Sequence, residues 1–370
     1  MEGPILQTEL VDPPIEPVDS FPIGVGHDGD IAHVLPIGRH LIVIDHKRPW
    51  ITGNALIAPE RRGLSTMYDR PPTSVLLPTT KWTDACAELA AQLEDSDELL
   101  IIHDSEDDPV TAQEDHLEGV RFIAAGEPEG CSGKANAIAA GMEAARHDRL
   151  VWTDDDFHHP PDWLTTLNIE YEDYGPVSEV PYFVGQDLLS VLLEPLYASA
   201  GSLPLYLGNQ IWGGAVIFEC GDLDEAAFLD ELRRTVSDDG LLMEYLQVTT
   251  VGRTRIVPIG GTIHEAVERP VRWTQILRWH FPGAIAGTWL ISLLVLTGAV
   301  LAPLPVAAVL TVLHFAVNEV LGVRRWTAVL AYPALFVFVP LVLYGLVSRT
   351  FVWSGRRYRW REKFDVTVGE

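Results

Sequence analysis

From residue 283 to residue 347 the chain is almost continuously apolar, and this stretch restricts the possible folds most strongly. It divides into three segments, 283–303, 304–323 and 326–347. Each is about as long as one bilayer-crossing helix, which needs roughly 20 apolar residues. A buried core helix is the alternative for any one of them, but three in succession with polar flanks predict a transmembrane region at 283–348.

The charges around these segments predict on which side of the membrane each end lies. The loop at 323–326 is basic, as is the tail at 349–363, where aromatic residues alternate with the basic ones. Both are typical of the cytoplasmic surface of a membrane. We therefore expect two full crossings, with the third segment, interrupted by Pro333 and Pro340, re-entrant or lying on the surface. Three crossings remain the alternative, and 349–370 is expected to be a basic cytoplasmic tail.

Before the apolar region, residues 71–282 alternate between short apolar runs and helical patterns. This alternation predicts an α/β domain with a mostly parallel sheet flanked by helices. The expected strands are 74–78, 98–103, 120–124 and 149–153, and the expected helices between them are 83–93 and 134–146. Residues 1–70 are rich in proline and glycine and carry no signal-peptide pattern, so we treat them as an extension of unknown role.

The composition excludes some functions. There are 26 Lys+Arg against 52 Asp+Glu, a formal net charge of −26, which would repel the phosphates of a nucleic acid. Adaptation to high salt explains this acidity best, and we take a halophilic source as a hypothesis. Cys86, Cys131 and Cys220 form no C-x-x-C spacing, which argues against a disulfide framework and a zinc site.

Acidic residues follow two of the expected strands. Asp104 begins an acidic loop after the second strand, and Asp154 to Asp156 follow the fourth. Ligands gather at the carboxyl ends of the strands in such sheets. A third acidic pair, Asp238 and Asp239, opens a later helix. An isolated acidic triplet in a chain this acidic is more often a solvated loop, so only the ordered set indicates a site.

These residue types suit the transfer of a sugar from a nucleotide diphosphate. A divalent cation, Mg²⁺ or Mn²⁺, neutralises the leaving diphosphate, and Asp154 and Asp156 have the D-x-D spacing that presents two carboxylates to it. A general base must take the proton of the acceptor hydroxyl, and Asp239, with Asp238 beside it, is the candidate. Asp104 is expected to hold the base or ribose of the nucleotide.

A further motif lies just before the apolar region. Gln275, Arg278 and Trp279 are spaced i, i+3 and i+4, which places them on one face of a helix. We expect the amide and guanidinium to hold the diphosphate and the indole to contact the sugar or lipid head. Lys134 either contacts phosphate or merely opens its helix, and we favour phosphate.

Other candidates have an equally good or better structural explanation. His158, His159 and His264 are more simply surface or structural histidines than metal ligands. The segment Trp212-Gly213-Gly214 either lines the acceptor pocket or is a tight turn before a strand.

In this order the motifs resemble those of the family 2-type glycosyltransferases of the GT-A fold, and most closely the ceramide glucosyltransferase-like branch, family 21. The resemblance covers about residues 72–360. The matching segments are Ile102-His-Asp-Ser-Glu-Asp-Asp-Pro109, Ser132-Gly-Lys-Ala-Asn-Ala-Ile138, Val151-Trp-Thr-Asp-Asp-Asp156, Pro161-Asp162, Ser237-Asp-Asp239 and, for the (Q/R)xxRW motif, Gln275–Trp279.

The resemblance implies a nucleotide-sugar donor, expected to be a UDP-sugar, and a divalent metal. It also implies inversion at the anomeric carbon with Asp239 as general base, and a lipid acceptor at the cytoplasmic face of the cell membrane. Two departures stand out. The N-terminal membrane helix common in that branch is not present here, and the second acidic loop has three aspartates, which leaves open which carboxylate meets the metal.

Three other functions were weighed. A processive polysaccharide synthase also uses this motif, but two or three helices cannot easily enclose a polymer channel. Transfer to a polyprenyl phosphate for protein or envelope glycosylation is the main enzymatic alternative. A non-catalytic module that only binds a nucleotide sugar is the alternative from another class.

Overall fold

The computed structural model describes residues 33–37, 40–44, 70–113 and 117–369. The chain divides into two units, Met1–Ala55 and Leu56–Glu370. In the first unit the described residues are strands β1 (His33–Ile37) and β2 (His40–Ile44), which pair antiparallel. Most of the extension predicted over residues 1–70 lies outside the described residues.

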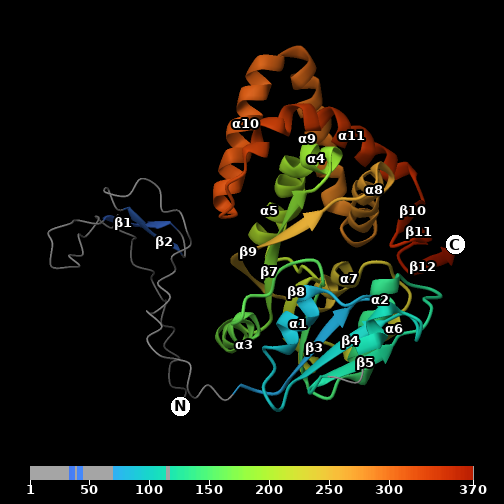
Figure 1. Ribbon diagram of the computed structural model, residues 1–370. Helices are drawn as coiled ribbons and strands as arrows, with labels where there is room; N and C mark the ends of the chain where they lie inside the picture. Colours follow the sequence, from blue (N-terminus) through green and yellow to red (C-terminus); the bar gives the residue numbers. More distant parts are fainter. Residues whose placement is uncertain (1–32, 38–39, 45–69, 114–116, 370) are drawn as a thin grey trace, which may run out of the picture. The chain divides into compact units, whose positions relative to one another are not determined.

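The second unit is built around a seven-stranded sheet with the strand order β5-β4-β3-β6-β8-β7-β9 (Figure 1). All neighbouring strands are parallel except that β8 runs antiparallel to β6 and β7, so the prediction of a mostly parallel sheet is confirmed. The strands are β3 (Thr73–Pro78), β4 (Glu98–His103), β5 (Val120–Ala124), β6 (Arg149–Thr153), β7 (Val177–Gly185), β8 (Ala215–Glu219) and β9 (Thr249–Ile259).

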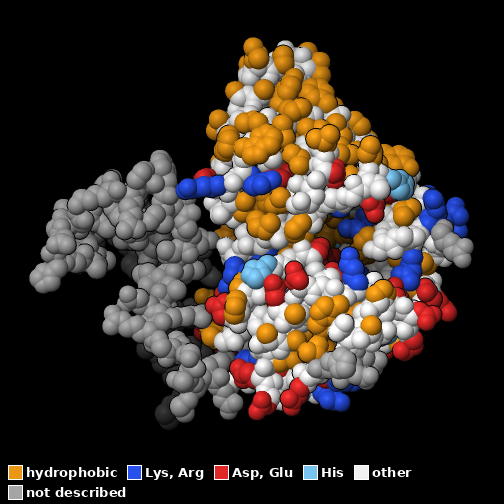
Figure 2. All heavy atoms as spheres, in the orientation of Figure 1, with side chains coloured by type: hydrophobic (Ala, Val, Ile, Leu, Met, Phe, Trp, Pro, Cys, Tyr) orange, Lys and Arg blue, Asp and Glu red, His pale blue; other side chains and the backbone are white. Residues whose placement is uncertain are grey.

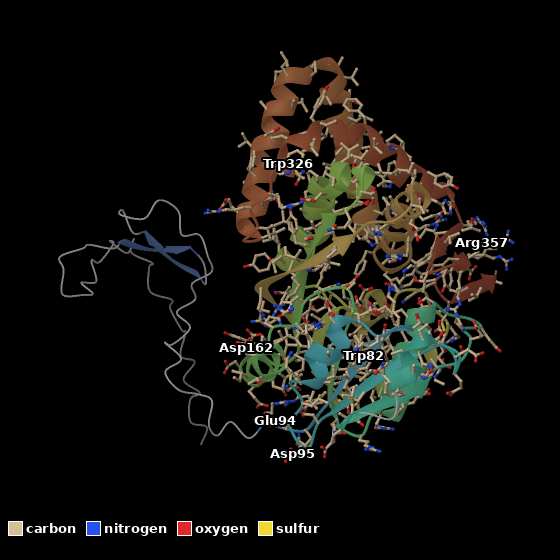
Figure 3. The ribbon with its side chains drawn as sticks, viewed as in Figure 1. Trp82, Glu94, Asp95, Asp162, Trp326 and Arg357 are labelled. Carbon is tan, nitrogen blue, oxygen red and sulfur yellow. The ribbon has the colours of Figure 1, made fainter. Side chains whose placement is uncertain are left out.

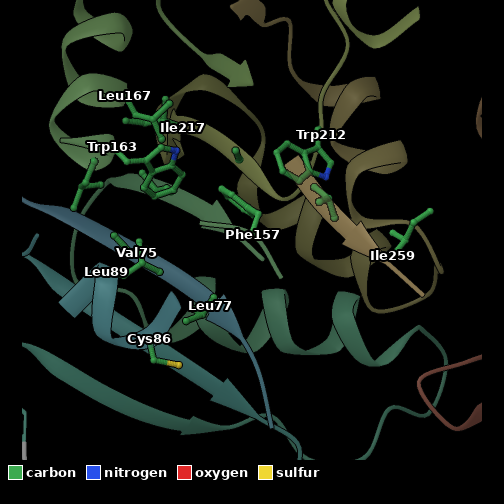
Figure 4. Close-up of a cluster of buried hydrophobic side chains, with 14 of the residues drawn as sticks. Val75, Leu77, Cys86, Leu89, Phe157, Trp163, Leu167, Trp212, Ile217 and Ile259 are labelled. Atoms are coloured by element: carbon green, nitrogen blue, oxygen red, sulfur yellow. The ribbon is translucent and has the colours of Figure 1, made fainter. Parts of the chain in front are cut away.

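Both faces of this sheet are covered by helices, and alternate residues of the inner strand β3 pack against opposite layers. Val75 and Leu77 of β3 belong to one buried cluster, which includes side chains of α1 (Asp84–Ala90) and α3 (Trp163–Tyr174) (Figure 4). Leu76 belongs to a second cluster with α2, α6 and α7. These helices span Gly133–Ala144, Glu225–Leu232 and Asp238–Tyr245, and short 3₁₀ turns lie at η1 (Pro109–Gln113) and η3 (Cys220–Asp222).

The three predicted apolar segments are helices, namely α9 (Pro282–Leu301), α10 (Pro303–Val320) and α11 (Ala331–Val347), the last preceded by η4 (Trp326–Leu330). Hydrophobic side chains cover this end of the second unit (Figure 2), among them the exposed Leu294, Leu304 and Val312. By length and composition, Pro303–Val320, Trp326–Val347 and also Leu188–Leu207 suffice to cross a membrane. Leu188–Leu207 comprises α4 (Leu188–Tyr197), η2 (Ala198–Ser202) and α5 (Leu203–Leu207).

Helix α11 lies along α4 and along α8 (Ile263–His280), and both of its ends are bound to them. At its start, Arg325 donates to both carboxylate oxygens of Glu194 on α4, over 2.7 and 2.9 Å, and the Thr327 hydroxyl donates to the same group. At its end, Arg278 of α8 donates to the carbonyl oxygen of Leu346 over 2.8 Å. The Glu194 carboxylate is fully buried, so its charge is compensated by this pair.

The segment after α11 is a three-stranded antiparallel sheet of β10 (Thr350–Trp353), β11 (Arg356–Glu362) and β12 (Asp365–Gly369), where we expected a basic tail on the membrane surface. In β11 the sequence alternates, with Tyr358 and Trp360 buried and Arg357 and Arg359 exposed. This is the two-residue period of a half-buried strand. The basic residues therefore lie on one face while the aromatic ones pack against α8.

Candidate active site

An ion-paired lysine joins the acidic segments predicted from the sequence. Lys134 lies in the first turn of α2, and its Nζ is 2.6 Å from Oδ1 of Asp154 and 3.4 Å from Oδ2 of Asp238. Burial favours the neutral amine, but the charges of Asp154 and Asp238 outweigh it, so the pKa of Lys134 is raised. The loop after β6 and the start of α7 thus meet at one ammonium group.

The two aspartates that open α7 have different environments. The Ser237 hydroxyl caps this helix, and Oδ1 of Asp239 accepts from that hydroxyl over 2.6 Å and from the Gly240 amide over 2.7 Å. Asp238 is buried, and burial raises the pKa of its carboxyl to about 6, although the Lys134 ammonium acts in the opposite direction. Asp239 therefore keeps its second oxygen available, while Asp238 faces the lysine.

Two glycines let the backbone pass between these carboxylates. A Cβ at Gly213 would lie 2.8 Å from Oδ2 of Asp238, and one at Gly214 would lie 2.7 Å from Oδ2 of Asp154. Such approaches are closer than real Cβ atoms make, so the segment after Trp212 has no room for side chains here. The segment is a tight turn before β8, and its role in lining an acceptor pocket stays a prediction.

The three aspartates after β6 have separate surroundings that fit a divalent cation. The Asp155 carboxylate accepts a 2.6 Å hydrogen bond from the Thr79 hydroxyl, so one of its oxygens is bound by protein. Asp156 keeps an exposed side chain, yet burial of its carboxylate and the Asp154 charge raise its pKa to about 7. A cation would relieve this repulsion. Among the described residues no three acidic, histidine or cysteine side chains form a ligand cluster.

Asp104 directly follows His103, the last residue of β4. Its loop is held by Asp108, whose Oδ2 accepts from the amides of Asp104 and Ser105 over 2.8 and 2.9 Å. The carboxylate of Asp104 itself is bound by Arg356 from the C-terminal sheet, over 2.9 Å. This arginine was not among the residues that the sequence indicated.

The contacts of Arg278 and Trp279 are with elements other than the acidic group. Arg278 reaches the end of α11, and the Trp279 ring lies 6.4 Å from that of Trp360 between centroids. Gln275 is buried, and among the described residues neither its amide nitrogen nor its amide oxygen has a hydrogen-bond partner. Arg278 and Trp279 therefore join α8 to its neighbours, and the contact of these three residues with a diphosphate stays a prediction.

A second copy of the same motif, Arg269-Pro-Val-Arg272-Trp273, lies six residues earlier in α8, and its Arg272 interacts electrostatically with the acidic group. Burial and the neighbouring Arg269 lower the pKa of Arg272 to about 10, while the charges of Asp239, Asp238 and Asp154 act against them. The guanidinium carbon of Arg272 lies 4.1 Å from the Trp353 ring centroid, and Arg272 donates no hydrogen bond within the described part of the chain. Nη1 of Arg269 is also buried without a partner.

This second copy of the motif could have been found in the sequence, but our sequence-based prediction did not include it. It has the same (Q/R)xxRW spacing six residues earlier, and it continues into the same helix. Its tryptophan, Trp273, packs between Phe183 and Tyr197, with ring centroids 5.0 and 4.9 Å away. Nη2 of Arg269 donates to the carbonyl oxygen of Gly260 over 3.4 Å, whereas the Arg272 guanidinium has no carboxylate partner among the described residues and could bind an anion.

The histidines have structural surroundings. His159 is buried, and its Nε2 lies 2.7 Å from the Thr153 hydroxyl. His158 is exposed and pairs with Glu88, and His264 lies on the surface of α8 next to Glu268. Burial lowers the pKa of His159 to about 4, so it is neutral at ordinary pH.

Comparisons with known proteins found similarity over part of the chain. Residues 82–213 match the family model described as Glycosyl transferase family 2. No curated protein matches the chain. Among solved structures, glucosyl-3-phosphoglycerate synthase from Mycobacterium tuberculosis, in complex with Mn²⁺ and uridine-diphosphate-glucose, is 13% identical with a TM-score of 0.37, and the match covers 56% of this chain and 79% of that one. TarS 1–349 from S. aureus with UDP-GlcNAc is 10% identical with a TM-score of 0.36, over 80% of this chain and 99% of that one.

The matched segment contains Asp104, Lys134 and the Asp154–Asp156 loop, and it ends at Gly213, the first of the two glycines that pass between the carboxylates. Residues 82–213 are therefore similar to the family described as Glycosyl transferase family 2, and apolar helices follow this segment along the chain.

Proposed function

We propose that this protein is a membrane-bound inverting glycosyltransferase that moves a hexose from a nucleotide diphosphate to a lipid, as in the ceramide glucosyltransferase-like branch. The convergence of Lys134, Asp154 and Asp239 with the unpaired Arg272 supports this proposal most directly. These groups combine cations for a diphosphate with a carboxylate for proton abstraction. Such a set suits group transfer better than mere binding.

On the donor side, Asp154 and Asp156 would hold a divalent cation that neutralises charge on the leaving diphosphate. Lys134 is placed to contact the same diphosphate, because its ammonium lies against Asp154. Arg272 and Arg269 supply further positive charge from α8. The nucleotide end then lies toward Asp104, at the end of the neighbouring strand β4.

On the acceptor side, Asp239 takes the proton. Its Oδ1 is held by the Ser237 hydroxyl and the Gly240 amide, which leaves Oδ2 to accept from the acceptor hydroxyl. As the hydroxyl oxygen attacks the anomeric carbon, the bond to the diphosphate breaks on the opposite face, so the configuration inverts. Asp238 keeps Lys134 in place and takes no part in this proton transfer.

We further propose that α9 and α10 cross the cell membrane and that α11 lies along the cytoplasmic domain. Helix α9 has 20 residues, about 30 Å, which matches the hydrocarbon thickness. The segment before α11 is bound to α4 through Glu194, and the end of α11 is bound to α8 through Arg278. These contacts favour a position of α11 on the same side of the membrane as α4 and α8. The basic loop and the C-terminal sheet would then share the cytoplasmic side, as the positive-inside tendency requires.

The activity is tested with purified protein in lipid nanodiscs, a panel of nucleotide sugars, and Mg²⁺ or Mn²⁺. We expect one donor to release nucleoside diphosphate and to label a lipid, and Asp239→Asn to abolish both. Thin-layer analysis separates a stable neutral glycolipid from an acid-labile polyprenyl phosphodiester. Product formation by Asp239→Asn at the wild-type rate would show that Asp239 is not the general base, and absence of product with every donor would leave only a binding module.

The topology is tested by cysteine labelling in intact cells, after Cys86, Cys131 and Cys220 are replaced by serine. A cysteine at Ala302, between α9 and α10, should react with an impermeant maleimide from outside. A cysteine at Arg324 should react only after the cells are opened. External labelling at Arg324 would contradict the two-crossing arrangement.

A further inference from the structure

The C-terminal sheet reaches the site through one arginine. Nη1 of Arg356, in β11, lies 2.9 Å from Oδ2 of Asp104, a residue 252 positions earlier in the chain. Its Nη2 lies 3.0 Å from Oε2 of Glu127. Both the arginine and Asp104 are largely covered, with side chains only 22% and 21% exposed. Water is therefore partly excluded from this ion pair, and the attraction between its charges is stronger than at an open surface.

The sheet that carries Arg356 is held firmly. Phe351, Tyr358 and Trp360 are buried, and they pack with Val236 before α7 and Val271 on α8. The Tyr358 hydroxyl also accepts the amide hydrogen of Gly133, at the start of α2, over 3.1 Å. Arg356 is therefore supported from the same elements that carry Lys134, Asp239 and Arg272.

The start of α2 is shaped around this contact. A Cβ at Gly133 would lie 3.0 Å from Nη1 of Arg356, closer than nearly all real Cβ contacts. Oδ1 of Asp104 has no hydrogen-bond partner among the residues that the structure describes, whereas Oδ2 is taken by Arg356. One oxygen is thus fixed by protein and the other is left for a ligand.

We propose that Arg356 is a positioning residue of the donor site, which makes the C-terminal sheet part of the nucleotide pocket. The guanidinium fixes the plane of the Asp104 carboxylate, so that Oδ1 accepts a hydrogen bond from a ribose hydroxyl or a base N–H. This inference rests on the proposed function, which assigns Asp104 to the nucleotide. It adds a residue far outside the segment that matches the family model, residues 82–213.

The test measures binding of UDP, GDP, ADP, CDP and dTDP, each with Mn²⁺, to the full chain in nanodiscs. For the nucleotide that binds, Arg356→Ala should weaken affinity about tenfold, as loss of an orienting charged partner commonly does. The KM for the matching nucleotide sugar should rise by the same factor, with kcat within about twofold because the reacting atoms are untouched. Arg356→Lys, which keeps one charged donor, should recover part of the affinity.

Arg357 provides the matched control. It is the next residue in the same strand, it is exposed, and it points away from the domain (Figure 3). Arg357→Ala removes an equal charge and should leave nucleotide affinity unchanged. Similar weakening in both variants would mean a general loss of positive charge, and the proposal would be wrong.

A double-mutant cycle separates positioning from direct contact. In an Asp104→Ala background, adding Arg356→Ala should cost no further affinity, because Arg356 acts through Asp104. Fully additive losses would assign Arg356 to a direct phosphate contact and overturn the proposal. If the wild type binds none of the five nucleotides and turns over no nucleotide sugar, the proposed function falls and takes this inference with it. If the wild type binds and Arg356→Ala binds equally well, the inference alone falls.

Discussion

Lys134 and Asp154 are separated by a helix and a strand, yet the lysine Nζ and the aspartate Oδ1 lie 2.6 Å apart. The pair places a cation at the carboxyl end of β6, where the acidic loop begins. Because Asp238 shares the same ammonium at 3.4 Å, the lysine also ties the loop to α7. The charge balance of this group leads to the first prediction.

Divalent cation binding should depend on pH. Burial and the Asp154 charge raise the pKa of Asp156 to about 7, and a metal binds only the ionised carboxylate. We expect the Mn²⁺ affinity, measured by calorimetry with UDP present, to rise with pH through about 7 and to level off above it. Asp156→Asn should weaken binding and remove this pH dependence. Asp162→Asn, an exposed substitution before α3, should change neither.

Substitutions in the two copies of the (Q/R)xxRW motif should have different effects. Arg272→Gln removes charge beside Asp239 and should lower the transfer rate about a hundredfold, the usual size for losing one electrostatic contact in the transition state. Arg278→Gln breaks the hydrogen bond to Leu346 and should instead destabilise the fold by roughly 1.5–3 kcal/mol. Initial rates and thermal unfolding of both variants measure the contrast. Equal losses of activity at matched stability would reject the assignment of Arg272.

A methyl group at Gly213 should impair the site with little effect on the fold. Its Cβ would lie 2.8 Å from Oδ2 of Asp238, so the carboxylate or the backbone must shift. A displacement of about 1 Å in such a site commonly costs about a hundredfold in rate. Gly221→Ala is the control, since no heavy atom lies within 4 Å of the added Cβ. Wild-type rates for Gly213→Ala would show that the close approach has no catalytic consequence.

Acid should destabilise the protein partly through His159. Burial lowers its pKa from 6.5 to about 4, so the folded state holds the neutral ring while the unfolded chain takes up a proton. The free energy of unfolding should therefore fall as the pH drops from about 7 to 4, with about 3 kcal/mol from this residue. In urea titrations, His159→Gln should lose less stability over this range than the wild type. His264→Gln, on the surface of α8, should behave as the wild type does.

The sequence alone predicted strands β3, β4, β5 and β6 and the edge of the sheet at which two acidic loops lie, but it did not predict β7 or the C-terminal sheet. Apolar runs such as the one at β4 predict buried strands, and parallel strands bring their carboxyl ends to one edge. Asp104 and Asp154 follow such ends, so their placement on that edge needed no coordinates. The apolar helices were equally predictable, because an apolar segment of about 20 residues is typical of a membrane-spanning helix.

Only the tertiary structure decided which arginine and which end of the chain reach the site. Arg272 and Arg278 are six residues apart, about 600° around a helix, which leaves them about 120° apart in direction. The packing of α8 against α11 selects one of these directions, and no local pattern records that choice. Arg356 likewise meets Asp104 across 252 residues because β11 folds back onto α8 and α2. Periodicity fixes which residues share a face, but contacts between distant elements fix what that face meets.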